Sequence, residues 1–194
     1  MKTEEVDQQV PTSDGVSARV RAAWDVAASI TRRTFAAALF TSVALAGSMP
    51  GTYAERVALA IAGCCLATSA LVDTVEHRLP NRLLAVAAVV SLAAAVLQGM
   101  PSVAVGGLFG AAIAGGAMLL VRLTRGVGMG DVKMAAAIGL SLGQLDLIAA
   151  PAAIAIAAVV AATYGMTAGR VRLALGPSLW FGWAAAIAAV SVWS

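Results

Sequence analysis

Long apolar runs alternate with short polar segments, many of which contain glycine or proline. The runs are Phe35–Met49, Val57–Val72, Leu83–Leu97, Val103–Leu123, Val132–Leu142, Leu147–Met166 and Leu179–Trp193. A helix that crosses a bilayer needs about 20 apolar residues, with about 17–25 tolerated, so several runs must be extended by their flanks. The pattern predicts an all-α, polytopic helical membrane protein with about seven transmembrane helices. Without the short run Val132–Leu142 the number would be six.

The composition agrees with a membrane location. Of 194 residues, 60% are hydrophobic and 12% are charged, whereas soluble domains carry about 45–50% apolar and about 25% charged residues. This balance excludes a soluble cytosolic enzyme, a disulfide-stapled secreted domain and a disordered tail. The two cysteines, Cys64 and Cys65, are adjacent within an apolar run. Neighbours on a helix point in different directions, so we interpret both as packing residues rather than metal ligands.

The basic residues predict the orientation in the membrane. All of them except Arg56 precede the first run or border the connections that follow the second, fourth and sixth runs. Lys and Arg accumulate on the cytoplasmic side of membrane proteins. We therefore expect residues 1–33 to form a polar cytoplasmic tail and residues 34–194 a membrane domain with its C-terminus outside. The net charge of +3 then reflects sidedness and contact with lipid, and we expect no nucleic-acid partner.

Few carboxylates occur in the apolar part of the chain. Beyond residue 56 they are Asp73, Glu76, Asp131 and Asp146. An ionisable group at a membrane helix by default indicates function, whereas Asp146 falls in a short outer connection where water solvates it. Asp73 ends the second run and Asp131 begins the fifth. The predicted orientation puts both at the cytoplasmic face.

Two carboxylates at one depth are typical of a general acid/base pair, in which one is protonated and the other ionised. Gly128 and Gly130 precede Asp131 and permit a close backbone approach that larger residues would block. The alternative is that each aspartate caps a helix or pairs with Arg78 or Lys133. Glu76 is a substitute acid if Asp73 is dispensable. Helix dipoles favour the anion at a helix start, which predicts an ionised Asp131 and a protonated Asp73.

Three ordered motifs resemble those of the type IV prepilin peptidases, which are membrane aspartic peptidases of the Gly-x-Gly-Asp type. Gly128-Met129-Gly130-Asp131, followed by Lys133, is similar to the signature motif of that family. The other two are Asp73 with Pro80 and Asn81 downstream, which is similar to the first aspartate motif, and Gly176-Pro177, which is similar to the closing motif. The likeness extends over about Thr34 to Trp193.

The resemblance implies an aspartic endopeptidase that removes the leader peptide of prepilins at the cytoplasmic face of the bacterial inner membrane. Its catalytic pair would be Asp73 and Asp131, and its partner a prepilin. Metal and organic cofactors are not implied. The residues that would bind substrate or shape the site are Gly128, Gly130, Lys133, Pro80, Asn81, Gly176 and Pro177. For Lys133, a contact with lipid phosphate, a contact with the pair or the substrate, and simple solvation stay open.

The chain contains no Cys-x-x-Cys motif, which large family members use in a zinc-binding loop associated with N-methylation. It is therefore more similar to the small members that serve tight-adherence (Flp-type) pili, and N-methyltransferase activity is not expected. Two other functions are considered. A proton-coupled transporter would use Asp73 and Asp131 as a relay, and a non-enzymatic pilus-assembly subunit would use them as contacts. A relay needs carboxylates at successive depths, whereas both of these are expected at one end. Many transporters also show inverted repeats with interrupted helices, a pattern that this chain lacks.

Overall fold

The structure is a computed structural model that describes residues 32–76, 79–124, 127–168 and 174–193. The chain divides into two units, Met1–Ala36 and Ala37–Ser194, and each is considered by itself. Of the polar tail predicted for residues 1–33, all but the last two residues lie outside the described part. Within the described residues the regular secondary structure is helical, and no strand occurs. The predicted all-α membrane fold is confirmed.

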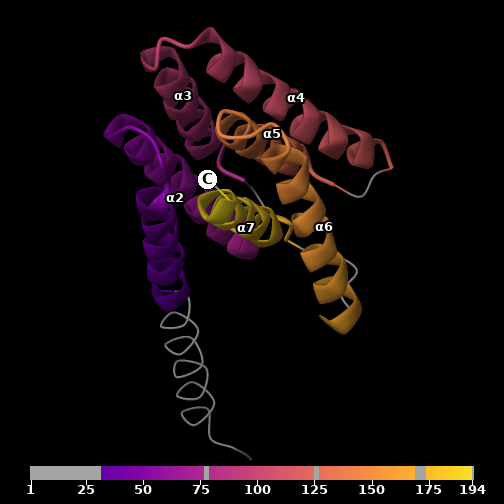
Figure 1. Cartoon of the computed structure of the whole chain (residues 1–194). Coiled ribbons are helices and arrows are strands. Elements are labelled where there is room, and N and C mark those ends of the chain that lie inside the picture. Colours follow the sequence, from indigo (N-terminus) through magenta and orange to yellow (C-terminus); the bar gives the residue numbers. More distant parts are fainter. Residues whose placement is uncertain (1–31, 77–78, 125–126, 169–173, 194) are drawn as a thin grey trace, which may run out of the picture. The chain divides into compact units, whose positions relative to one another are not determined.

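Each predicted apolar run coincides with one helix of the described chain (Figure 1). Residues 32–48 are helical. The later helices are α2 (Tyr53–Glu76), α3 (Asn81–Leu97), α4 (Pro101–Leu123), α5 (Met129–Leu142), α6 (Ala149–Ala168) and α7 (Gly176–Trp193). Proline occurs at four of the starts: Pro80 is the extended residue before α3, and Pro101, Pro151 and Pro177 lie in the first turns of α4, α6 and α7. Proline suits these positions because its missing N–H would have no helical partner there.

The helices differ in their ability to cross a bilayer. Among the described residues, α2, α4, α6 and α7 are long and apolar enough to span, and α3 is apolar but has only 17 residues. α5 has 14 residues, which extend about 21 Å against a hydrocarbon core of about 30 Å. Ten of those residues are buried. α5 is therefore a short central helix surrounded by protein, which is why its apolar run is the shortest.

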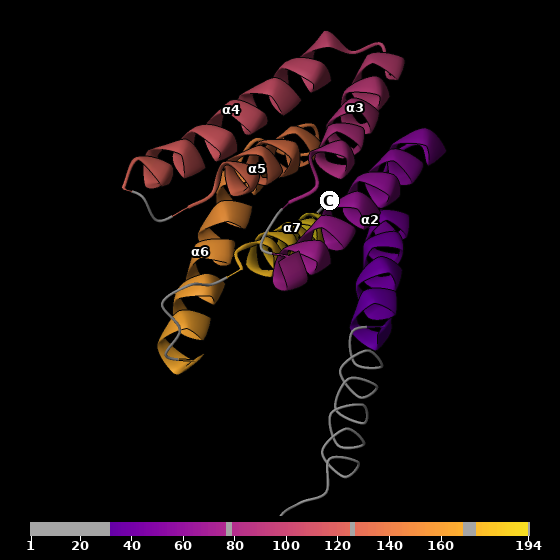
Figure 2. The same cartoon turned by 180° about the vertical axis from the view of Figure 1, so that it is seen from behind.

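Glycines bring α4 and α5 into backbone contact, and both figures show the two helices side by side (Figures 1 and 2). Gly106 and Gly110 on α4 face Gly143, the C-cap of α5, and Gly139 on α5, so the helices are antiparallel. A Cβ added to Gly110 would lie 2.9 Å from the Cα of Gly143. Small residues permit this approach and increase van der Waals packing where lipid provides no hydrophobic driving force.

A buried tryptophan connects α7 to α2 and α5. Trp183 has no exposed surface, and its indole N–H donates a 3.1 Å hydrogen bond to Ser141 Oγ on α5. On the α2 side the ring packs against Gly63, where a Cβ would lie 2.9 Å from the indole Cζ3. This contact attaches the three helices to one another. The end of α2 meets the start of α7, where Asp73 accepts the N–H of Gly176, and Leu79, which follows α2, lies against Gly130 at the start of α5. The end of α2 and the starts of α5 and α7 therefore lie at the same end of the bundle.

Substituting Gly139 with alanine tests the α4–α5 contact. The added Cβ would lie 2.8 Å from the Cβ of Ala114 and against the backbone of Gly110, so the helices must separate. We expect Gly139→Ala to lower the free energy of unfolding by about 1–3 kcal/mol. The matched control is Gly116→Ala on α4, whose Cβ would meet nothing within 4 Å. The control should be neutral or stabilising by about 0.5–1 kcal/mol. Equal thermal unfolding of the two variants in detergent would contradict the packing.

Candidate active site

Asp73 lies in the last turn of α2 and is buried, with 7% of its surface exposed. Its Oδ2 accepts a buried 3.0 Å hydrogen bond from the backbone N–H of Gly176, the first residue of α7. Gly176 has no room for a side chain, because a Cβ would lie 3.0 Å from the Cα of Ala70 and from the Cβ of Asp73. The glycine therefore lets the start of α7 lie directly against the carboxylate.

Asp131 lies in the first turn of α5 and is also buried, with 9% of its surface exposed. Its Oδ2 accepts a 3.1 Å hydrogen bond from the backbone N–H of Gly128, which has the extended conformation of an N-cap. A Cβ added to Gly128 would lie 3.2 Å from that same carboxylate oxygen, and no other atom would be as close. Gly128 therefore contributes chiefly through its backbone, by capping α5 and holding the Asp131 side chain.

Gly130 has a different role, which is to admit the connection between α2 and α3. A Cβ on Gly130 would lie 2.9 Å from the Cβ of Leu79, which directly precedes Pro80. A second contact follows at once, where Lys133 Nζ donates a 3.0 Å hydrogen bond to Asn81 Oδ1. The start of α3 is thus attached to the start of α5, and of the predicted site-shaping residues Gly128 and Gly176 are bonded directly to the two aspartates.

The two carboxylates act on each other electrostatically. Burial raises the pKa of Asp131 from its ordinary 3.8 to about 6, the hydrogen bond from Gly128 lowers it, and the charge of nearby Asp73 raises it. Asp131 precedes the apolar run of α5, and α5 is not among the spanning helices. The pKa of Asp131 is thus raised, whereas its position at a helix start predicts a stabilised anion and a lowered pKa. Desolvation of the buried carboxylate outweighs the favourable helix start.

Other candidates lie elsewhere. Glu76 is exposed at the end of α2. Asp146 is exposed beyond the other end of α5, where its Oδ1 accepts a 2.9 Å hydrogen bond from Ile148 N–H. Arg78 lies outside the described residues. Cys64 and Cys65 are half-buried and unbonded to each other. In the described part of the chain, no three His, Cys, Asp or Glu side chains lie close enough together to hold a metal ion.

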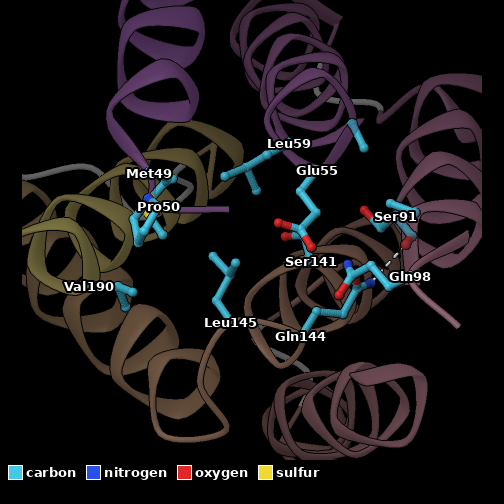
Figure 3. Close-up of a pocket in the computed structure, with 12 residues that line it drawn as sticks. Met49, Pro50, Glu55, Leu59, Ser91, Gln98, Ser141, Gln144, Leu145 and Val190 are labelled. Carbon is cyan, nitrogen blue, oxygen red and sulfur yellow. Dashed lines mark hydrogen bonds between the residues drawn. The ribbon is translucent and has the colours of Figure 1, made fainter. Parts of the chain in front are cut away.

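A cavity of about 220 Å³ lies at the end of the bundle opposite the aspartates (Figure 3). Its polar lining comes from Glu55 on α2, Ser91 on α3 and Gln98 at its C-cap, and Ser141 and Gln144 on and after α5. The amide of Gln144 donates 2.9 and 3.0 Å hydrogen bonds to the carbonyl oxygens of Ser91 and Leu140. Sequence analysis missed this cavity, because its polar residues are single positions scattered over separate segments.

Comparison with known proteins identifies the family. The family model described as the type IV leader peptidase family matches residues 59–166, more than half of the chain. The chain belongs to the type IV leader peptidase family. The matched segment contains Asp73 and the Gly128–Asp131 motif, and it ends before Gly176. Searches of curated proteins and of solved structures returned no match.

Membership of the leader peptidase family confirms the resemblance drawn from the three motifs. It also shows that the protein is a peptidase of the prepilin-processing type, with a prepilin as the substrate that the family implies. The third motif, Gly176-Pro177, lies beyond the matched residues, yet Gly176 is the residue whose N–H bonds Asp73. The structure therefore connects that motif to the site independently of the family match.

The two glycines before Asp131 should respond differently to alanine. Gly130→Ala forces its Cβ against the Cβ of Leu79. Because a Cβ is attached directly to the backbone, Leu79 cannot relieve this contact by a change of rotamer. We expect a loss of about 1–3 kcal/mol in the free energy of unfolding. Gly128→Ala keeps the backbone N–H, and its extended φ of −76° suits alanine, so its loss should be under about 1 kcal/mol. A larger loss for Gly128→Ala in detergent melts would contradict these roles.

The raised pKa of Asp131 predicts that this aspartate destabilises the fold when ionised. A pKa of about 6 in the folded state against 3.8 means that the folded state holds the proton more strongly. Stability is then lost as the pH rises from about 4 to about 6. Above that window the loss is constant, on the order of 1–2 kcal/mol because solvent screens the carboxylate in part. Asp131→Asn cannot ionise and keeps an oxygen for Gly128, so it should melt higher than the wild type at about pH 8 and similarly at about pH 4.

Asp146→Asn is the control for this comparison, since Asp146 is exposed and its amide can still accept from Ile148. It should change the melting temperature little at either pH. The contrary result is that Asp131→Asn melts at a lower temperature than the wild type, and by the same amount at about pH 8 as at about pH 4. In that case the charge of Asp131 does not destabilise the fold.

Proposed function

We propose that this protein is a membrane aspartic endopeptidase that cleaves the leader peptide of Flp-like type IV prepilins at the cytoplasmic face. Asp73 and Asp131 form the catalytic pair. The observation that carries the proposal is that these two aspartates, distant in the sequence, are both buried and each accept a hydrogen bond from the backbone of a motif glycine. It is combined with membership of a leader peptidase family. Two adjacent carboxylates share a proton, and such a pair activates water for attack on an amide.

The remaining predicted residues are assigned to shaping the site and binding substrate. Gly128 and Gly130 hold the backbone before Asp131, and Pro80 with Asn81 begins α3 beside it. Gly176 and Pro177 begin α7 at Asp73. Lys133 is exposed and bonded to Asn81, which places a cation at the rim of the site, within reach of a peptide or a lipid phosphate.

We also propose the orientation and the domain division expected from the basic residues. Residues 1–33 are assigned to a cytoplasmic tail and residues 34–194 to the peptidase domain in the bacterial inner membrane, with the C-terminus outside. Asp73 and Asp131 then lie on the side where the basic connections lie, which is the side from which a prepilin leader is accessible. Lipid surrounds the exposed apolar faces of α4 and α6, on which Leu120 and Val159 are examples.

A proton-coupled transporter is less well supported. Asp73 lies in the last turn of α2 and Asp131 in the first turn of α5, at the same end of the bundle. Among the described carboxylates, none lies between them and the far end of the bundle, where Glu55 and Asp146 occur. A proton relay across the membrane would need acidic groups at intermediate depths.

Co-expression with a Flp-type prepilin tests the proposal. The wild type should shorten the prepilin by its leader, which gives a mobility shift and a new N-terminus. Asp73→Asn and Asp131→Asn should each reduce the cleavage rate by at least about 1,000-fold, since removing one member of a catalytic unit disables the unit. Mass spectrometry of the product should find an unmethylated N-terminal amine.

The matched controls are Asp146→Asn, at the opposite end of the bundle, and Glu76→Gln, on the same helix as Asp73. Both should cleave at about the wild-type rate. Wild-type cleavage by Asp73→Asn or by Asp131→Asn would refute the catalytic pair. Loss of cleavage in Glu76→Gln alone would assign the acid to Glu76 instead.

A further inference from the structure

We propose that the cavity opposite the aspartates binds a primary ammonium group carried on a short hydrocarbon, with Glu55 as its anionic partner. The proposed peptidase function makes no use of this cavity, and the ligand proposed here is independent of that function. The cavity has a volume of about 220 Å³. This is enough for a small organic molecule, since benzene fits an apolar cavity of about 150 Å³.

Glu55 is the only charged side chain among the described residues that line the cavity, and a capping box fixes its position. The backbone N–H of Thr52 donates a 2.7 Å hydrogen bond to Glu55 Oε2, and the N–H of Glu55 donates a 3.3 Å bond to Thr52 Oγ1. This reciprocal pair is typical of a helix start. A side chain at Gly51, whose φ is +133°, would meet the same carboxylate. The cap uses Oε2 and leaves Oε1 to accept a hydrogen bond from a ligand.

Two polar neighbours of Glu55 also present acceptors rather than donors. Gln144 Nε2 donates hydrogen bonds of 2.9 and 3.0 Å to carbonyl oxygens of α3 and α5. A side-chain amide has two N–H donors, so Oε1 is the group that Gln144 has left for the cavity. Ser141 Oγ donates a 2.9 Å bond to a carbonyl oxygen of its own helix and accepts the indole N–H of Trp183. Its remaining lone pair is again an acceptor, so this lining matches a ligand that donates hydrogen bonds.

Ser91 adds a buried hydroxyl without a partner. Only 5% of its surface is exposed, and it lines the cavity on the side of Gln98 and Gln144 (Figure 3). The hydroxyls of Ser69 and Ser141 donate to carbonyl oxygens of the preceding turn of their own helices. In the described part of the chain, no group forms a hydrogen bond with the Ser91 hydroxyl. Buried polar groups are normally bonded, so this hydroxyl is suited to contact a ligand in the cavity.

The charge around the cavity favours a single positive charge. Gln98 is the C-cap of α3 and Ser141 lies in the last turn of α5, and helix C-termini carry partial negative charge. The N-terminus of α2 is capped by Glu55 itself. Arg56, the neighbouring basic residue, does not line the cavity, and within the described residues no ion pair joins it to Glu55. One carboxylate matches a singly charged ligand, whereas calcium sites combine several oxygen ligands around a double charge.

The apolar side of the cavity favours an organic cation over an alkali ion. Figure 3 shows Met49, Pro50 and Val190 across the cavity from Gln98 and Gln144. A hydrated alkali ion would leave this apolar wall in contact with water. A short alkyl chain would cover the wall while its ammonium group donates to the oxygens on the opposite side. The two-sided lining therefore indicates a small amphipathic amine.

Titration of the purified protein with n-butylammonium chloride in a maltoside detergent tests the proposal. The indole N–H of Trp183 is bonded to Ser141 Oγ, so its ¹⁵N-tryptophan signal reports occupancy of the cavity. Ser141→Ala identifies that signal by removing its acceptor. We expect a saturable shift of the Trp183 signal, while the indole of Trp180, bonded to Ser42 outside the lining, stays constant. Neither n-butanol nor sodium chloride at equal ionic strength should produce the saturable shift.

Variants assign the binding to the cavity. Glu55→Gln retains an oxygen for the cap of α2 but loses the charge, so the dissociation constant should rise at least about 10-fold. Ser91→Ala should raise it by about 2–10-fold. Asp146→Asn is the matched control, because Asp146 is an exposed carboxylate at the same end of the bundle that does not line this cavity. Asp146→Asn and Asp131→Asn should both bind like the wild type, the latter because it alters the opposite end.

The ammonium group can belong to a free amine or to the ethanolamine headgroup of a phospholipid. Nanodiscs of phosphatidylethanolamine and of phosphatidylcholine separate these sources. A Trp183 shift in phosphatidylethanolamine without added amine assigns the headgroup, whereas a shift that requires butylammonium in both lipids assigns a free amine. Three results would overturn the proposal: no saturable shift with butylammonium, an equal shift with n-butanol, or an unchanged affinity in Glu55→Gln.

Discussion

The close approach of the start of α7 to the end of α2 is the contact on which the site depends. It requires a glycine at position 176, because a side chain would collide with Ala70 and Asp73. A second contact, the buried hydrogen bond from Trp183 to Ser141, attaches α7 to α5. Without this contact Asp73 would end a helix with unfavourable dipole alignment and no backbone donor. With it, the buried carboxylate of Asp73 has a hydrogen-bond donor from a second helix.

Asp131 is the second buried carboxylate of the site. Its environment disfavours its charge, chiefly through burial. A group kept out of its preferred ionisation state lowers the stability of the folded protein. Burying two carboxylates therefore has a thermodynamic cost, which the glycine-mediated packing of α4 and α5 and the tryptophan contact of α7 offset. Such a cost is typical of active sites, where environments shift pKa values for catalysis.

Much of the fold could be predicted from the sequence, because apolar runs between prolines and glycines define membrane helices directly. The Gly-x-Gly-Asp and Gly-Pro motifs likewise indicated the family and the residues around both aspartates. The short run of α5 suggested an incomplete span, but its central, protein-surrounded position depends on tertiary contacts. The helix-dipole argument considered each aspartate on its own helix and so missed the donor from α7. Leu79 and the cavity around Gln144 involve residues with no periodic or motif signal.

Binding of a transition-state analogue tests most directly whether Asp73 and Asp131 together hydrolyse an amide. The probe is a peptide spanning the leader junction of a Flp-type prepilin in which a hydroxyethylene group replaces the scissile amide. The account predicts that the purified protein binds this peptide at least about 100-fold more tightly than the uncleaved amide peptide. It predicts that Asp73→Asn and Asp131→Asn each abolish that preference, while Asp146→Asn keeps it. Equal affinity for the two peptides, or a preference that survives loss of either aspartate, would contradict it.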